Sequence, residues 1–134
     1  NILYPVFGFG NYNSYEIKPE LRDLISFSTS DLVKDLQNNN SLFDKPVVFM
    51  FRNVWFNFQA KENAKHVAEL LFSKLKSGSL VVLGESESNW FWQELGKRTT
   101  LTEIMEEVGF KHMTEKAKEI STQMCKEGYL FLRE

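Results

Sequence analysis

Cysteine, histidine and long apolar runs are all scarce in this chain of 134 residues. The single cysteine, Cys125, excludes an intrachain disulfide, and the two isolated histidines, His66 and His112, lack the spacing of a zinc site. No apolar run approaches the length of about 20 residues that is needed to span a bilayer. The first residues have neither the basic region nor the small-residue cleavage site of a signal peptide. We therefore expect a cytoplasmic protein in a reducing compartment, without membrane insertion and without a structural metal.

A strong excess of charge is also missing. The formal net charge is -2, and the 16 basic and 18 acidic residues are interspersed along the chain, which argues against nucleic acid as a partner. The hydrophobic fraction of 43% is ordinary for a globular protein and excludes a disordered or fibrous chain. The length predicts a single domain over residues 1–134.

The central part of the chain has the pattern of an α/β protein. Residues 47–51 are continuously apolar, which predicts a parallel strand that is covered on both faces and lies at the centre of a sheet. Residues 59–76 carry apolar side chains at three- and four-residue spacing, and Gly78 can end this helix in a left-handed cap. Residues 80–83 predict a second buried strand, so that strand, helix and strand form a parallel crossover unit.

The pattern is weaker towards the N-terminus. Residues 1–16 show no regular period and predict an irregular or partly extended lead-in. Pro19 predicts the start of a short helix over residues 19–24, and the alternation at residues 25–28 predicts a strand. The triple asparagine at residues 38–40 marks a loop.

The C-terminal third predicts a further helix and strand. Thr100 and Glu103 have the spacing of a capping box, and Gly109 marks the end of the helix that they begin. An amphipathic stretch follows around residues 114–124, and residues 129–132 predict a final strand.

Short motifs follow each of the two central strands. Arg-Asn-Val at residues 52–54 is followed by an aromatic run, the long helix and Lys-x-Gly, and the second strand ends in Gly-x-Ser-Glu at residues 84–87. This order resembles the CheR-like, chemotaxis-receptor methyltransferases, which depend on S-adenosylmethionine (SAM). Members of that family typically read Cys-Arg-Asn-Val, Tyr-Phe, a helix, Lys-Pro-Gly-Gly, a strand and Gly-His-Ser-Glu.

The similarity extends upstream. Residues 18–22 read Lys-Pro-Glu-Leu-Arg, and Phe27 and the pair Asp31 and Leu32 follow, similar to the family's Val-Lys-Pro-Glu-Leu-Arg, Phe and Asn-Leu. The resemblance covers roughly residues 15–88, in order and nearly without gaps. That collinearity is more specific than any one of the short motifs.

The resemblance implies a fold, a cofactor and a set of site residues. It implies a Rossmann-like class I methyltransferase sheet, with ligands bound outside the carboxyl ends of its strands. By position, Asp31 and Leu32 correspond to the pair that contacts adenine, and Arg52 and Asn53 to the pair that lines the SAM site. A full-length relative transfers a methyl group to a receptor glutamate and forms a methyl ester.

The chain departs from the family at three positions near the site. Phe51 stands where the family has Cys, Asn57 where it has Tyr, and Glu85 where it has His. The family's tyrosine ring lies near the transferred methyl group, and the amide of Asn57 reproduces neither its shape nor its hydroxyl. The catalytic residue is therefore unknown, and the alignment of substrate is in question.

The glycine-rich half of such an enzyme is not present. Gly8 and Gly10 have no preceding strand and no following helix, so they do not predict a cofactor loop. The resemblance thus implies an incomplete sheet, without its first two strands and the glycine-rich loop. Because the chain begins at Asn1 rather than Met, we expect an excised segment, a processed product or a sequence trimmed at its start. We expect a homodimer that exchanges strands, because the open sheet edges invite pairing.

Two functions remain open. The leading hypothesis is the C-terminal segment of a SAM-dependent protein-glutamate O-methyltransferase, with weak or no activity as an isolated chain. The second is a catalytically inactive, methyltransferase-like protein-binding module, in which the large aromatic side chains of Asn-Trp-Phe-Trp at residues 89–92 anchor a partner. Those rings could instead cover a sheet edge or close over a ligand cleft, which is the interpretation that we favour.

Overall fold

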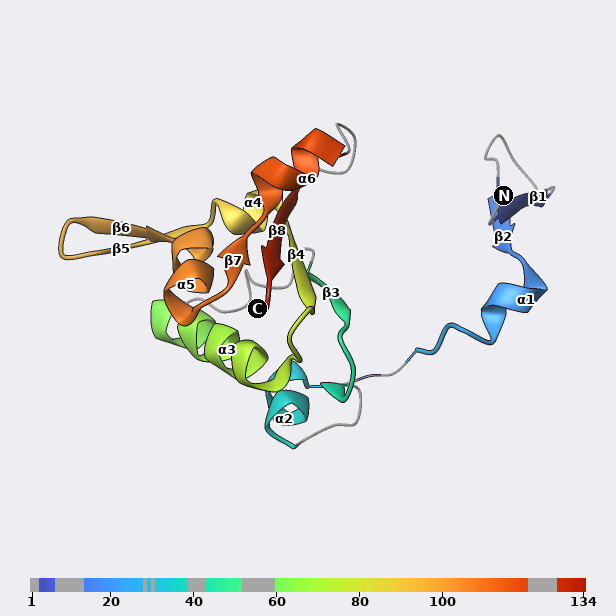
Figure 1. Cartoon of the computed structure of the whole chain (residues 1–134), viewed down its shortest axis with the longest axis horizontal. Helices are drawn as coiled ribbons and strands as arrows, with labels where there is room; N and C mark the ends of the chain where they lie inside the picture. Colours follow the sequence, from blue (N-terminus) through green and yellow to red (C-terminus); the bar gives the residue numbers. More distant parts are fainter. Residues whose placement is uncertain are drawn as a thin grey trace. The chain divides into compact units, whose positions relative to one another are not determined.

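The computed structural model describes residues 3–6, 14–27, 29, 31–38, 43–51, 60–120 and 128–134. The chain divides into two compact units, Asn1–Ser30 and Asp31–Glu134, which are considered separately below (Figure 1). Gly8, Gly10 and Cys125, which were discussed from the sequence, lie outside the described residues. The single-domain organisation over residues 1–134 remains a prediction.

The first unit contains one antiparallel strand pair and one short helix. Strands β1 (Leu3–Val6) and β2 (Ser14–Ile17) pair in antiparallel register, and helix α1 (Pro19–Arg22) follows. The sequence predicted only a partly extended lead-in, because these residues have no strand period. Pro19 begins α1 as predicted, since proline fits the first helical turn, where its missing N–H is not needed.

The prediction of a strand over residues 25–28 is wrong for residues 25–27, which the structure describes. Ile25, Ser26 and Phe27 belong to neither a helix nor a strand, and Phe27 is almost fully exposed. Alternation of apolar and polar residues is a local pattern, whereas a strand also needs a neighbour that supplies its hydrogen bonds. Among the described residues of this unit, the strand pairing involves β1 and β2 alone.

The second unit is built on a small mixed sheet, which confirms the α/β prediction in coarse form. Its strands run in the order β3 (Val48–Phe51), β4 (Leu80–Gly84), β8 (Gly128–Leu132) and β7 (Lys111–His112). Strands β3 and β4 are parallel, and β8 is antiparallel to both β4 and β7. Doubly wound α/β sheets often carry such antiparallel strands beside a parallel core.

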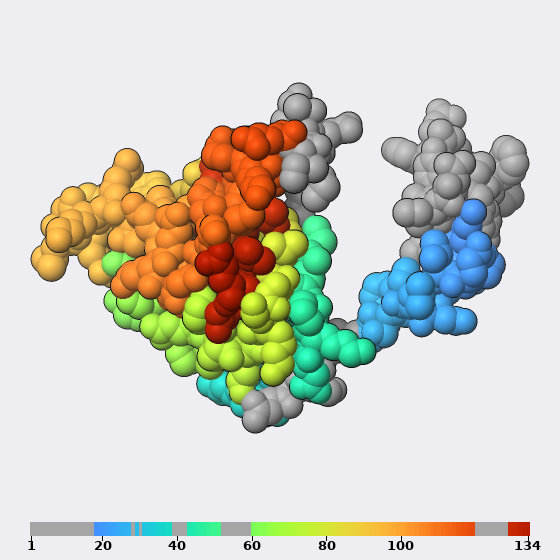
Figure 2. All heavy atoms as spheres, viewed as in Figure 1, coloured from blue at the N-terminus to red at the C-terminus, as the bar shows by residue number. Residues whose placement is uncertain are grey.

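Among the described strands β3 lies at the edge of the sheet, and its predicted place at the centre is wrong. Among the described residues it pairs with β4 alone, and Val48 and Met50 are 62% and 64% exposed. Phe51, at the end of the strand, is buried. The residues 43–51, teal in Figure 2, accordingly form one outer side of this unit. A continuous apolar run shows that a strand can be buried on both faces. It does not show which other strands and helices lie beside it.

Five helices accompany this sheet within the described residues. They are α2 (Leu32–Gln37), α3 (Lys61–Lys74), α4 (Glu85–Ser88), α5 (Leu101–Val108) and α6 (Thr114–Ile120). Helix α3 packs against both α2 and α5 (Figure 1). The sequence predicted α3 and α5 but not α2 or α4, which span few residues and lack a clear apolar period.

One apolar core joins the sheet to the helices. The buried side chains of α3 are Ala64, Val67, Ala68 and Leu71, and they belong to the same cluster as Val81, Leu83, Leu101, Ile104, Met105 and Phe131. This is the face that the three- and four-residue spacing predicted. The parallel β3–α3–β4 unit is therefore confirmed.

The glycine predicted to cap α3 lies farther along the chain than the helix end. Helix α3 ends at Lys74, and its C-cap residue Leu75 has an extended conformation. Gly78 does adopt a left-handed φ of 86°, but it forms the turn into β4, where its N–H donates to the carbonyl of Arg133 at 2.7 Å. The helix is shorter than its apolar pattern because Leu75 turns into the core.

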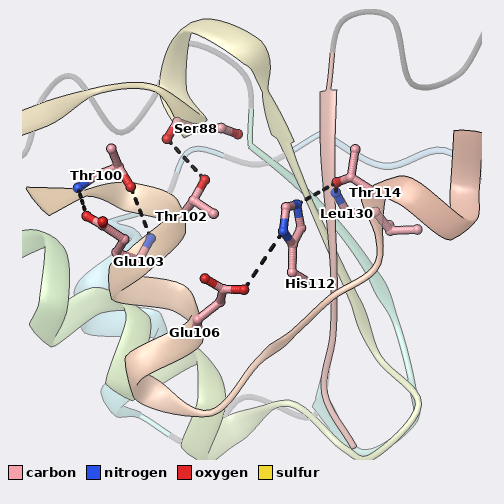
Figure 3. Close-up of polar contacts among 8 residues, drawn as sticks. All are labelled: Ser88, Thr100, Thr102, Glu103, Glu106, His112, Thr114 and Leu130. Carbon is pink, nitrogen blue, oxygen red and sulfur yellow. Dashed lines mark hydrogen bonds and ion pairs between the residues drawn. The ribbon is translucent and has the colours of Figure 1, made fainter.

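The predicted capping box of α5 is confirmed. The Thr100 hydroxyl accepts the N–H of Glu103 at 3.2 Å, and the Glu103 carboxylate accepts the N–H of Thr100 at 2.6 Å (Figure 3). Gly109 ends the helix with a φ of 114°. The short strand β7 and helix α6 follow, and β8 was correctly predicted near residues 129–132.

A β-hairpin that the sequence did not predict lies between α4 and α5. Strands β5 (Phe91–Glu94) and β6 (Lys97–Thr100) pair around Leu95 and Gly96, which both have positive φ. Figure 1 shows the hairpin extending away from the four-stranded sheet. A positive φ at both turn positions defines a type I′ turn, for which Asn-Gly is the usual signal and leucine an uncommon residue.

No helix among the described residues is both long and apolar enough to cross a membrane.

Replacing Gly109 with alanine should destabilise the second unit. A Cβ atom there would lie 2.9 Å from Cζ of Phe72, and the positive φ disfavours any side chain. We expect a loss of about 2–4 kcal/mol in the free energy of unfolding, measured by urea denaturation. Gly96→Ala is the matched control, because its φ is also positive but no atom lies within 4 Å of the added Cβ. Equal losses in the two variants would contradict the steric contribution of Phe72.

The ion pair between α3 and α5 should be visible in an NMR pH titration. Lys65 Nζ lies 2.6 Å from Glu107 Oε1, and the hydrogen bond from Lys65 lowers the pKa of the Glu107 carboxyl. A lowered folded-state pKa contributes stability above the unfolded pKa, and that contribution is lost as the pH falls through the folded value. Lys65→Met should raise the pKa of Glu107. Lys118→Met should leave it unchanged and instead raise the pKa of Glu115, which Lys118 lowers.

Candidate functional site

The ends of the two parallel strands define the candidate site. Phe51 at the end of β3 lies in register with Leu83 of β4, so both strands finish at the same edge of the sheet. Gly84 then leads directly into α4. Ligands of open α/β sheets bind outside such carboxyl ends. We call this region, formed by Phe51, Leu83, Gly84 and α4, the carboxyl edge.

Buried polar groups hold the turn from β4 into α4. The N–H of Gly84 donates to Glu87 Oε2 at 3.2 Å, and the hydroxyl of Ser88 donates to the Gly84 carbonyl at 3.0 Å. Glu87 and Ser88 are 1% and 0% exposed. The hydroxyl of Thr102 donates to the Ser88 carbonyl at 3.1 Å and so connects the turn to α5 (Figure 3). The backbone of the turn is therefore fixed from the protein side.

The same turn presents two polar side chains to solvent. Glu85 and Ser86, in the first half of α4, are both exposed. A carboxylate accepts hydrogen bonds, and a serine hydroxyl both donates and accepts them. These groups are compatible with the hydroxyl and amino groups of a nucleoside ligand.

Asp31, one of the residues singled out from the sequence, caps helix α2. Its Oδ1 accepts the N–H groups of Val33 at 3.1 Å and Lys34 at 3.2 Å, while Oδ2 lies 3.8 Å from Lys34 Nζ. Leu32 is partly buried and packs against the core. The sequence analysis missed this cap, although aspartate directly before an apolar residue is a recognised helix start.

Helix α2 does not lie beside α4. In Figure 1, α2 lies next to α3. Helix α4 lies near the opposite end of the four-stranded sheet (Figure 1). The described structure therefore does not bring the capped start of α2 together with the β4–α4 turn. Arg52, Asn53 and Asn57 lie outside the described residues, and Arg52 follows Phe51 directly in the sequence.

A second polar cluster, around His112, is structural. The His112 ring lies with Nε2 2.9 Å from the Thr114 hydroxyl and Nδ1 3.9 Å from Glu106 Oε1 (Figure 3). This order of carboxylate, imidazole and hydroxyl is superficially that of a hydrolase triad. However, Thr114 is only 2% exposed, and its oxygen already accepts the N–H of Leu130 at 2.8 Å. The hydroxyl thus anchors α6 to β8 and cannot reach a substrate.

No group of three potential metal ligands occurs in the part of the chain that the structure describes.

Comparison with known proteins identifies the family. The family model described as "CheR methyltransferase, SAM binding domain" matches residues 4–105, which is more than half of the chain. No match was found among curated proteins or among solved structures. The matched domain is defined by its binding of SAM, the methyl donor, and its range includes β3, β4 and the turn into α4. The chain therefore belongs to the CheR methyltransferase family, and its cofactor is S-adenosylmethionine.

Proposed function

We propose that this chain is the C-terminal segment of a SAM-dependent protein-glutamate O-methyltransferase. In its full-length form the enzyme transfers a methyl group to a receptor glutamate. The single observation that carries this proposal is the match to the family's SAM-binding domain over residues 4–105. The motifs at residues 18–22, 52–54 and 84–87, which resemble those of the receptor methyltransferases, support the acceptor class.

The chemistry asks little of the protein beyond positioning. Bound SAM supplies a methyl group that is already activated by its sulfonium leaving group. The protein must hold an acceptor oxygen in line with that methyl group and exclude competing water. The fixed turn between β4 and α4 is suited to this task, because its backbone is held by Glu87 and Ser88.

We assign the cofactor contacts by resemblance. Arg52 and Asn53, which follow β3 in the sequence, line the SAM site. Asp31 and Leu32 contact adenine in the full-length enzyme, although the described structure does not bring the start of α2 together with the β4–α4 turn (Figure 1). Asp31 Oδ1 is occupied by the start of α2, whereas Oδ2 belongs to a half-exposed side chain and can accept from an amino group. The catalytic residue is not assigned, since Asn57 stands in place of the family's tyrosine.

The parent enzyme has a Rossmann-like class I sheet, of which this chain lacks the first two strands and the glycine-rich loop. Val48 and Met50 lie on one face of β3, the edge strand of the described sheet, and their exposure supports this proposal, because a doubly wound enzyme normally covers both faces of its parallel strands. A second copy of the chain can cover the same edge, and a strand-exchanged homodimer is accordingly part of the proposal. A cytoplasmic location fits the receptor substrate.

A catalytically inactive, protein-binding module is the second candidate. It is favoured by the exposed apolar residues of the β5–β6 hairpin, namely Phe91 and Leu95, together with Trp90 just before it. The guanidinium of Arg98 lies 4.4 Å from the centre of the Phe91 ring and holds that ring in place. Trp92, in contrast, packs against the core. The aromatic cluster is thus divided between the core and a surface that a partner could bind.

Calorimetric titration of SAM and S-adenosylhomocysteine into the 134-residue chain tests the cofactor site. We expect weak binding by the isolated chain, reduced about tenfold or more by Arg52→Ala and by Asn53→Ala, because each removes polar contacts worth about 1.5–3 kcal/mol. Arg98→Ala and Asn63→Ala are the matched controls, since they remove the same side chains on the hairpin and on α3.

Two results would change the assignment of the SAM site. Absence of binding by a folded chain would restrict the SAM site to a longer parent protein. Binding that the Arg52 and Asn53 variants leave unchanged would contradict the residue assignment but not the cofactor.

The acceptor class can be tested by the stability of the product. With labelled SAM and receptor-derived peptides that contain glutamate, we expect label that mild base releases as methanol, because methyl esters are hydrolysed by base. Peptides with glutamine in place of glutamate serve as the control. Base-stable label would exclude carboxylate methylation.

A further inference from the structure

We infer that Glu87 is a positioning residue for the SAM site, because its buried carboxylate holds the β4–α4 turn that presents Glu85 and Ser86 at the carboxyl edge. This inference rests on the proposed function.

The burial of Glu87 is the first observation. Glutamate is almost never fully buried, because removing its carboxylate from water is costly unless hydrogen bonds replace the lost solvation. Glu87 is nevertheless 1% exposed, directly beside the end of β4. Its Oε2 accepts the N–H of Gly84, and a Cβ added to Gly84 would lie 3.4 Å from that same oxygen. The carboxylate is thus packed closely against the last residue of the strand.

A comparison within the chain separates this role from ordinary helix capping. Glu103 performs the same backbone task in α5, since its Oε2 accepts the N–H of Thr100 at 2.6 Å. Glu103 does so from an exposed position. Capping a helix therefore does not require a buried carboxylate, and the burial of Glu87 needs another explanation. The two glutamates differ in place, because Glu87 alone lies at the carboxyl edge.

Further hydrogen bonds fix the turn that the Glu87 carboxylate holds. Gly84 is held on both sides of its backbone, with its N–H on Glu87 and its carbonyl on the Ser88 hydroxyl. The N–H of Asn89 donates to the Glu85 carbonyl at 3.1 Å, and that of Trp90 donates to the Glu87 carbonyl at 3.0 Å. The backbone from residue 84 to residue 90 therefore has little freedom. A ligand that contacts Glu85 or Ser86 meets groups already in position, so less binding energy is lost in ordering them.

The test compares affinity with stability in four variants of the full chain, all measured well below their unfolding midpoints. By calorimetric titration of SAM, Glu87→Ala should weaken binding about tenfold, because the ligand must then order a turn that the Glu87 carboxylate no longer holds. Glu87→Gln keeps an oxygen that can accept from Gly84 and should restore affinity to within about threefold of the parent chain. Glu103→Ala is the matched control, and it should lower the unfolding midpoint while affinity stays within about twofold.

Ser88→Ala keeps the test decisive if Glu87→Ala does not fold. It removes the hydrogen bond to the Gly84 carbonyl with little change in volume, and about threefold weaker binding is expected, because the ligand must then order a less restrained turn. Absence of SAM binding by the folded, unsubstituted chain would overturn this inference and restrict the SAM site to a longer protein. If the unsubstituted chain binds SAM but Glu87→Ala and Glu103→Ala change its affinity equally, the inference is overturned and the proposed function stands.

Discussion

The packing of α3 against β4 and α5 is the contact on which the second unit depends. Helix α3 connects two parallel strands, and its buried stripe, which includes Val67 and Leu71, shares one core with Val81 and Leu83. Burying such aliphatic side chains stabilises a fold by about 1.5–3 kcal/mol each. The same contact sets the strands β3 and β4 parallel and side by side, so that both finish at one edge. The place of the candidate site is therefore a consequence of how the core forms.

Buried hydrogen bonds support the polar groups at that edge. Exposed Glu85 and Ser86 stand on a backbone that buried Glu87 and Ser88 hold, and Thr102 ties this backbone to α5. Fully satisfied buried polar groups rigidify a structure because leaving any one of them unpaired is costly. The carboxyl edge is therefore kept in place by buried hydrogen bonds that connect it to the core, and not by the surface residues themselves. Binding sites gain precision when rigid elements carry them.

Several elements could be predicted from the sequence because their signals are local. The period of α3, the capping box of Thr100 and Glu103, and the apolar strand β4 all depend on residues close in the chain. The family motifs likewise pointed to the ends of β3 and β4, and the family match agrees with them. The hairpin β5–β6 was missed because its turn uses Leu95 and Gly96 instead of Asn-Gly. Helix α2 was missed because six residues carry too little periodicity to be recognised.

The sequence by itself determined the α/β class, the secure helices and strands, and the membership in a SAM-dependent family, since spacing and motif order are properties of the chain alone. Only the tertiary structure decided that β3 is an edge strand, that Ile25 to Phe27 form no strand, and that Asp31 caps a helix. It also decided that Glu87 is buried while Glu103 is exposed, although both occupy the same position in a capping motif. The physical reason is that pairing and burial depend on which distant residues arrive as neighbours, and a local pattern does not contain that information.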